Sequence, residues 1–135
     1  MNPVIARQFD PHLLSRVEDA GLNASAPPQQ RWLDGWLVRL SPGKAKRARC
    51  INAVAAGRMP VPSKLALCEP VYAQAELPLI VRITPFSEPI GLDATLDAMG
   101  LQRFDDTRVM VLQDLPAIDV PSLPAGISIQ SIGLE

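Results

Sequence analysis

The sequence predicts a mixed α/β (α+β) fold, and three observations carry that prediction. Strand-like runs alternate along the chain with segments whose apolar residues recur at helical spacing. The longest strand-like region, residues 31–54, contains a proline–glycine turn and places apolar side chains on both faces, which is typical of a strand inside a layered sheet. The length of 135 residues suits one domain with its own core.

The central expectation is a long β-hairpin. Residues 31–40 and the return run 47–54 form its strands. Residues 41–44 form the turn, because proline suits its first central position and glycine accepts a positive φ. With the two-residue period of a strand, Trp32 and Trp36 fall on one face. Both indole rings are therefore expected to be buried.

Three helices are expected, at residues 10–21, 63–75 and 89–100. Asp10 can cap the first helix, and a glycine ends both the first and the third pattern. Pro70 lies inside the second pattern, where it removes an amide donor and collides with the preceding turn. That helix is therefore expected to be kinked or divided in two.

The remaining patterns are strand-like. A short buried strand is expected at residues 79–83, and final strand material at 101–112, with a bulge or tight turn at its two adjacent aspartates. Residues 126–132 alternate apolar and polar side chains. The expected organisation is a loose lead-in over 1–9, one domain over 10–113, a proline-rich linker over 114–125 and a further strand over 126–135.

Composition and charge exclude several classes of partner. Thirteen basic and fourteen acidic residues leave almost no net charge, so electrostatics predicts binding neither to nucleic acid nor to an anionic membrane. No apolar run approaches the roughly 20 residues needed to cross a bilayer, and no signal-peptide pattern is present. Cys50 and Cys68 lie in apolar runs without metal-ligand spacing. We expect a soluble protein of the reducing cytoplasm, with no metal site.

No stretch contains a recognisable catalytic motif, so no catalytic residue is predicted. Arg39, Asn52 and Arg82 are polar residues on otherwise apolar strands, where burial without a partner costs about 1–3 kcal/mol. These three are the candidates for substrate binding. The alternative, which is slightly favoured, is that they bond to one another or to loop carbonyls. His12 has no acidic or histidine partner at helical spacing and is expected to be an ordinary surface residue.

The order of the expected elements resembles that of the GCN5-related N-acetyltransferase (GNAT) superfamily without its first strand. Three short sequence segments resemble the amino-terminal half of a group of bacterial proteins that have two such domains in tandem. They are Ala26-Pro27-Pro28, Asp34-Gly35-Trp36-Leu37-Val38-Arg39 and Lys46-Arg47-Ala48-Arg49-Cys50-Ile51-Asn52-Ala53-Val54. The resemblance extends over most of the chain, from residue 10 into the strand at 126–132. It implies a mixed, mostly antiparallel sheet with helices on both faces.

One segment departs from the superfamily pattern. Active members bind the pyrophosphate of acetyl-CoA on a loop that reads Arg or Gln, two residues, Gly, one residue, Gly or Ala, where a strand passes into a helix. Residues 55–62 take that place in this chain, with a single glycine. Pro60 and Pro62 lack the amide hydrogens that such a loop uses. The resemblance therefore implies a non-catalytic half that binds no acetyl-CoA itself.

Two functions remain open. In the first, the chain is the amino-terminal domain of an N-acetyltransferase, structural or substrate-facing, and a C-terminal GNAT domain beyond Glu135 binds acetyl-CoA and transfers the acetyl group. In the second, the chain is a free-standing, non-catalytic interaction module that pairs with a second copy of itself. Residues 127–132 are expected to add to an open sheet edge, either in their own chain or in a second copy.

Overall fold

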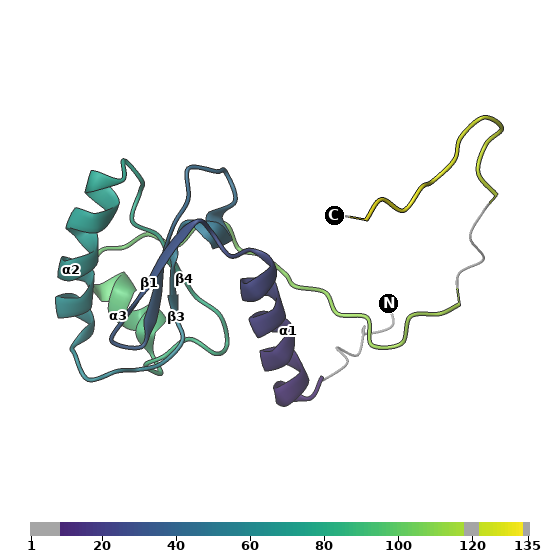
Figure 1. Cartoon of the computed structure of the whole chain (residues 1–135). Coiled ribbons are helices and arrows are strands. Elements are labelled where there is room, and N and C mark those ends of the chain that lie inside the picture. The colour runs from purple at the N-terminus through teal and green to yellow at the C-terminus, as the bar shows by residue number, and fades with distance from the viewer. Residues whose placement is uncertain (1–8, 118–121, 134–135) are drawn as a thin grey trace. The chain divides into compact units, whose positions relative to one another are not determined.

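The computed structural model describes residues 9–117 and 122–133 (Figure 1). The elements within these ranges are α1 (Pro11–Ala24), β1 (Gln29–Leu33), β2 (Trp36–Leu40), the short 3₁₀ helix η1 (Lys46–Ala48), β3 (Ile51–Ala53), α2 (Val61–Gln74), β4 (Val81–Arg82) and α3 (Leu92–Ala98). The fold is mixed α/β, as expected. Most of the expected lead-in, part of the linker and the last two residues of the chain lie outside the described residues.

The four strands form one sheet in the order β1-β2-β3-β4. The first two pairings are antiparallel and the third, between β3 and β4, is parallel. Helix α2 makes the crossover between the two parallel strands, which cannot be joined by a tight turn. The sheet is therefore mixed and mostly antiparallel, as expected.

The expected single strand over residues 31–40 is wrong, because a tight turn at Asp34 and Gly35 divides it into β1 and β2. Both turn residues have positive φ, 43° and 84°, which defines a type I′ turn. Its backbone twist matches that of the flanking strands, and Asp-Gly is among its preferred sequences. The dipeptide Asp34-Gly35 is itself a hairpin signal in the sequence, but the turn was predicted only at the proline and glycine of residues 41–44.

Because of the tight turn, Trp32 and Trp36 do not share one face of the sheet as expected. Across the hairpin Trp32 pairs with Leu37, and Leu33 pairs with Trp36, so the two indole rings point to opposite faces. Trp36 is fully buried, whereas Trp32 is 64% exposed. The prediction that both rings are buried is therefore wrong for Trp32.

The expected hairpin between residues 31–40 and 47–54 is confirmed in its pairing and corrected in its length. Strand β3 pairs antiparallel with β2, with Val38 opposite Ile51 and Trp36 opposite Ala53. The return strand covers only residues 51–53, and η1 lies in the connection before it. Basic residues fill that connection, and η1 satisfies part of its backbone through the bond from Arg49 N to Lys46 O.

All three expected helices are present, and each has bounds that differ from the expected ones; α3 begins at Leu92 instead of residue 89. Asp10 caps α1 by accepting a hydrogen bond from the His12 amide at 3.1 Å, but α1 continues past Gly21 to Ala24. Helix α2 is continuous through Pro70. Pro70 and Ala66 are both exposed, so water can satisfy the carbonyl that the proline leaves without a donor. The predicted division of α2 is therefore not formed.

The hydrophobic core lies on one face of the sheet. Alternate strand residues Trp36, Val38 and Leu40 from β2, with Ile51 and Ala53 from β3, pack with buried residues of α2 and α3: Leu65, Cys68, Tyr72, Leu92 and Leu96. Helices α2 and α3 lie on this side, and α1 lies on the opposite side (Figure 1). No side chain of α1 is fully buried, so this helix is held in a different way.

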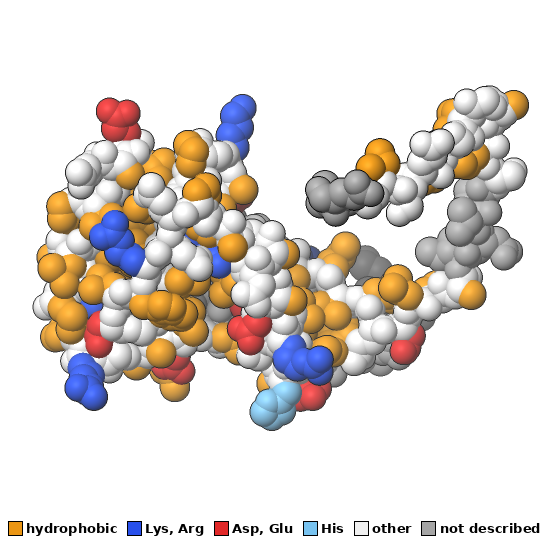
Figure 2. Space-filling model, in the orientation of Figure 1, with side chains coloured by type: hydrophobic (Ala, Val, Ile, Leu, Met, Phe, Trp, Pro, Cys, Tyr) orange, Lys and Arg blue, Asp and Glu red, His pale blue; other side chains and the backbone are white. Residues whose placement is uncertain are grey.

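The chain divides into two units, Met1–Arg103 and Phe104–Glu135. The described part of the second unit has no helix or strand, so the strands expected at 101–112 and 126–132 are not formed. A strand needs a partner edge for its backbone groups, and the alternating pattern supplies none by itself. Figure 2 shows hydrophobic side chains along this segment; those most exposed are Met110, Leu115, Ile129 and Ile132.

Candidate functional site

The three candidate residues of the sequence analysis lie on one face of the sheet. Asn52 pairs with Leu37 on one side and with Arg82 on the other, so their side chains point the same way. Arg39 lies two residues after Leu37 and shares that face. This is the face covered by α1, opposite the hydrophobic core (Figure 1). The strands therefore bring all three polar side chains together beneath one helix.

Arg39 holds the end of α1 against the sheet. Its guanidinium is 2% exposed and donates to the Leu22 carbonyl at 2.8 Å and to the Ser25 carbonyl and hydroxyl at 3.4 Å. The carbonyls at a helix C-terminus lack intrahelical partners and carry partial negative charge, so a cation there is favourable. Burial lowers the pKa of Arg39, although an arginine stays protonated in proteins.

Arg82 holds α1 at its middle. Its two terminal nitrogens bond to both carboxylate oxygens of Glu18, a bidentate pair in which Nη2 and Oε2 are 3.1 Å apart. The hydrogen bonds that Arg82 donates to Glu18 raise the pKa of Arg82. Since α1 buries no complete side chain, these two arginines supply directional contacts that its apolar residues do not. The favoured alternative of the sequence analysis was bonding to one another or to loop carbonyls; Arg39 bonds instead to carbonyls at the end of α1, and Arg82 bonds to a carboxylate of α1.

Asn52 is the third candidate, and it is 4% exposed. Its Nδ2 donates to the Cys50 carbonyl at 3.4 Å, and its Oδ1 has no hydrogen-bond partner among the described residues. Cys50 lies two positions earlier on the same face, and burial raises the pKa of its thiol to about 11. A thiol that stays protonated at neutral pH is a poor nucleophile. The pair therefore has no arrangement for covalent catalysis.

A cavity of about 340 Å³ opens beside Asn52 and Arg82, between α1 and the segment after β4. Its lining includes, besides these two, Ser15, Glu18, Asp19, Thr84, Ser87 and Glu88. The charges of Glu18 and Arg82 compensate each other inside it. Its size would admit a small polar molecule, but the lining presents no nucleophile activated by a base and no free cation for phosphate.

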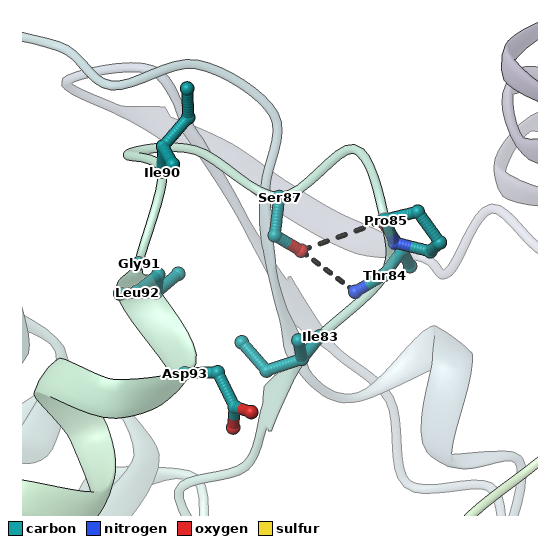
Figure 3. A pocket seen from close by; sticks show the side chains of 8 residues that line it. All are labelled: Ile83, Thr84, Pro85, Ser87, Ile90, Gly91, Leu92 and Asp93. Carbon is teal, nitrogen blue, oxygen red and sulfur yellow. Dashed lines mark hydrogen bonds between the residues drawn. The ribbon is translucent and has the colours of Figure 1, made fainter. Parts of the chain in front are cut away.

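A smaller hollow of about 180 Å³ lies between the end of β4 and the start of α3 (Figure 3). Ile83, Ile90 and Leu92 give it apolar walls. The Ser87 hydroxyl accepts from the Thr84 amide at 2.8 Å, and the carboxylate of Asp93 is paired with Arg103. The Ser87 hydroxyl and the Asp93 carboxylate of this hollow are therefore already paired within the chain.

The loop between β3 and α2 binds the carboxylate of Asp34, which lies in the tight turn between β1 and β2. Asp34 accepts hydrogen bonds from the Arg58 amide at 2.9 Å and from the Met59 amide at 2.7 Å. These amide bonds, from Met59 first and then from Arg58, lower the pKa of Asp34. The amides of Arg58 and Met59 are thus already paired with a carboxylate of the same chain.

Lys64 contacts both the tight turn and the loop through its ammonium group. Its side chain is 0% exposed, and its ammonium donates to the Asp34 carbonyl at 2.7 Å and to the Ala56 carbonyl. It also lies 3.2 Å from an Asp34 carboxylate oxygen and 4.9 Å from the centroid of the Trp36 ring. All three hydrogens of the ammonium therefore have an acceptor nearby. We name the set Asp34, Arg58, Met59 and Lys64 the Asp34 lock.

Two glycines allow the hairpin turn to approach the loop so closely. A Cβ atom on Gly57 would overlap the Asp34 backbone and carboxylate, and one on Gly35 would overlap the Ala55 carbonyl. The Ala55 amide also donates to the Gly35 carbonyl at 2.9 Å. The sequence analysis missed this contact. The Asp-Gly dipeptide predicts the turn, but nothing local to residues 55–64 indicates what the turn touches.

The described residues contain no group of three or more potential metal ligands. His12 lies exposed in the first turn of α1. None of the described helices has the length and apolar character required to cross a membrane. Comparison with known proteins finds no matching family model, no similar curated protein and no similar solved structure.

Proposed function

We propose that this chain is the amino-terminal, non-catalytic domain of a GNAT-family N-acetyltransferase, with acetyl transfer in a C-terminal domain. The Asp34 lock is the observation that carries the proposal. A loop that joins a strand to a helix, with its amides turned toward a carboxylate, is the geometry of an anion site whose anion is supplied internally. Acetyl-CoA would have to displace Asp34 to bind there.

The order of the elements supports the same proposal. A helix, an antiparallel part of the sheet, a crossover helix, a parallel strand and a third helix follow one another in the expected order, although the antiparallel part has three strands and the expected final strands are not formed among the described residues. The polar face beneath α1 supports a structural role over a catalytic one, because Arg39 and Arg82 both hold α1. The cavity beside Asn52 is the part of this domain that can face a substrate.

A free-standing interaction module is the second candidate. Phe104, Met110, Leu115 and the isoleucines at 127, 129 and 132 are exposed in a unit whose described residues form no helix or strand. Apolar side chains in such number favour a binding partner. The reading frame after codon 135 separates the two candidates. A glycine-rich phosphate loop within roughly another hundred residues, one domain length, supports the first, and a stop codon supports the second.

Titration calorimetry with coenzyme A and acetyl-CoA tests the non-catalytic assignment. Residues 1–135 should give no binding heat at protein concentrations of order 100 μM, since the Arg58 and Met59 amides are occupied and Pro60 and Pro62 have none. Micromolar affinity would overturn the assignment. An Asp34→Gly variant, which removes the carboxylate and keeps the positive φ, shows whether Asp34 alone excludes the ligand.

A further inference from the structure

The outer edge of β1 is open. Strand β1 is the first in the sheet order, and its other side pairs with no strand in the described part of the chain. Four of its five side chains are exposed, including Trp32 at 64%. The edge carries a large aromatic side chain and no proline, and the single charge of β1, on Arg31, shares the core face with Val38, so no charge of β1 lies on the face of Trp32. This edge is suited to accept another strand.

The hairpin geometry identifies which backbone groups face outward. Leu33 and Trp36 flank a two-residue turn, so they form a hydrogen-bonded pair, and such pairs alternate along an antiparallel ladder. Trp32 and Gln30 therefore belong to the non-bonded pairs, and their N–H and C=O groups point away from β2. Two residues separated by one position, both turned outward, are the docking points of an added antiparallel or parallel strand.

The second unit of the same chain contains a segment with the complementary chemistry. Residues 127–132 alternate apolar and polar side chains, yet they form no strand, and Ile129 is 81% exposed. The Ile127 amide donates to the Pro124 carbonyl in a turn, which leaves residues 128–132 for pairing. β-Branched residues opposite an aromatic side chain make favourable cross-strand pairs.

We propose that residues 128–132 of one chain add to the β1 edge of a second copy, and that the exchange is reciprocal. Each copy offers one open edge and one unpaired segment, so two copies satisfy each other and the assembly closes as a symmetric dimer. Residues 113–125 supply the reach, roughly 40 Å at about 3.1 Å per extended residue. The proposal does not depend on whether the chain belongs to an acetyltransferase.

The oligomeric state of the full chain is the test. Light scattering at protein concentrations of order 100 μM should give twice the chain mass of 14.6 kDa. Gln30→Pro should give a monomer, because the ring blocks the edge and removes an amide that points outward, while the bonds to β2 stay intact. Gln30→Ala keeps that amide and should remain a dimer.

Substitutions within residues 128–132 test the role of the added segment and leave the residues of the sheet unchanged. Ile129→Lys should give a monomer whose thermal midpoint does not depend on concentration, and Leu123→Lys, the same change outside the segment, should stay dimeric. Mixing the Gln30→Pro and Ile129→Lys chains should restore association, since the first still offers a segment and the second still offers an edge.

Three outcomes overturn the proposal. A monomeric wild-type chain at 100 μM with unchanged stability in Ile129→Lys would mean that the segment pairs with nothing. A monomeric wild-type chain that Ile129→Lys destabilises would mean that the segment pairs within its own chain. A dimer that survives both Gln30→Pro and Ile129→Lys would place the interface elsewhere, and would equally refute the exchange.

Discussion

Replacing Lys64 with methionine tests whether the Asp34 lock stabilises the fold. Methionine has nearly the volume of the lysine stem, so the packing against Trp36 is kept and little cavity forms. The ammonium is lost, and with it the donors to the Asp34 and Ala56 carbonyls and the cation facing the Trp36 ring. The variant therefore removes electrostatics and hydrogen bonds and leaves most of the apolar contact.

The magnitude follows from burial. Removing one partner of a buried ion pair costs about 3–5 kcal/mol. The Asp34 side chain keeps 19% of its exposure and can be partly hydrated once the ammonium is gone, so the lower end, about 3 kcal/mol, applies to Lys64→Met. For a domain of about 100 residues this lowers Tm by roughly 12 °C or more.

Urea unfolding followed by tryptophan fluorescence measures the loss. The midpoint should fall while the slope m stays the same, because the surface exposed on unfolding is unchanged. Lys44→Met is the matched control, since Lys44 is exposed, and it should change the free energy of unfolding by no more than about 0.5 kcal/mol. A loss below about 1 kcal/mol for Lys64→Met would refute the structural role assigned to Lys64.

Two further predictions concern the hairpin. Trp36→Ala should lower the free energy of unfolding by about 3–5 kcal/mol, because the ring is fully buried. Trp32→Ala in dilute, monomeric protein should lower it by less than about 1 kcal/mol, because that ring is exposed. Similar losses for the two variants in urea unfolding would contradict the finding that the two rings lie on opposite faces of the sheet. Asp34 has a lowered pKa in the folded state, so its stabilisation is complete above its usual value of 3.8 and is lost as the pH falls through the lower folded-state pKa. Stability measured from pH 5 to pH 2 should fall less steeply in Asp34→Asn than in the wild type, and an equal slope would show that the carboxylate is not held by the loop.

The sequence was sufficient for features that depend on local chemistry. Asp10 and the proline after it located the start of α1 to the residue, and the glycine at position 100 located the end of α3. The nearly continuous apolar run of residues 36–40 predicted a strand buried on both faces. In each case the signal and the structure that it produces lie within a few residues of one another.

Features that depend on distant contacts were not predictable in this way. The partner of Asp34 lies 24 residues away, and that of Glu18 lies 64 residues away. Arg39, Asn52 and Arg82 were recognised as unusual polar residues, but the sequence does not contain the strand register that collects them beneath α1. Strands were predicted at 101–112 and 126–132 from alternation, which sets the faces of a strand and not its partner.

The Asp34 lock links stability to the absence of a ligand. In a loop that binds phosphate, the amides stay unpaired until the ligand arrives, so an empty site has a cost in stability that binding later offsets. Here the chain satisfies those amides permanently, and the buried lysine beneath them adds to the same gain. A variant that bound an anion through these amides would first have to lose the contacts of Asp34, so stability and anion binding would oppose each other at residue 34.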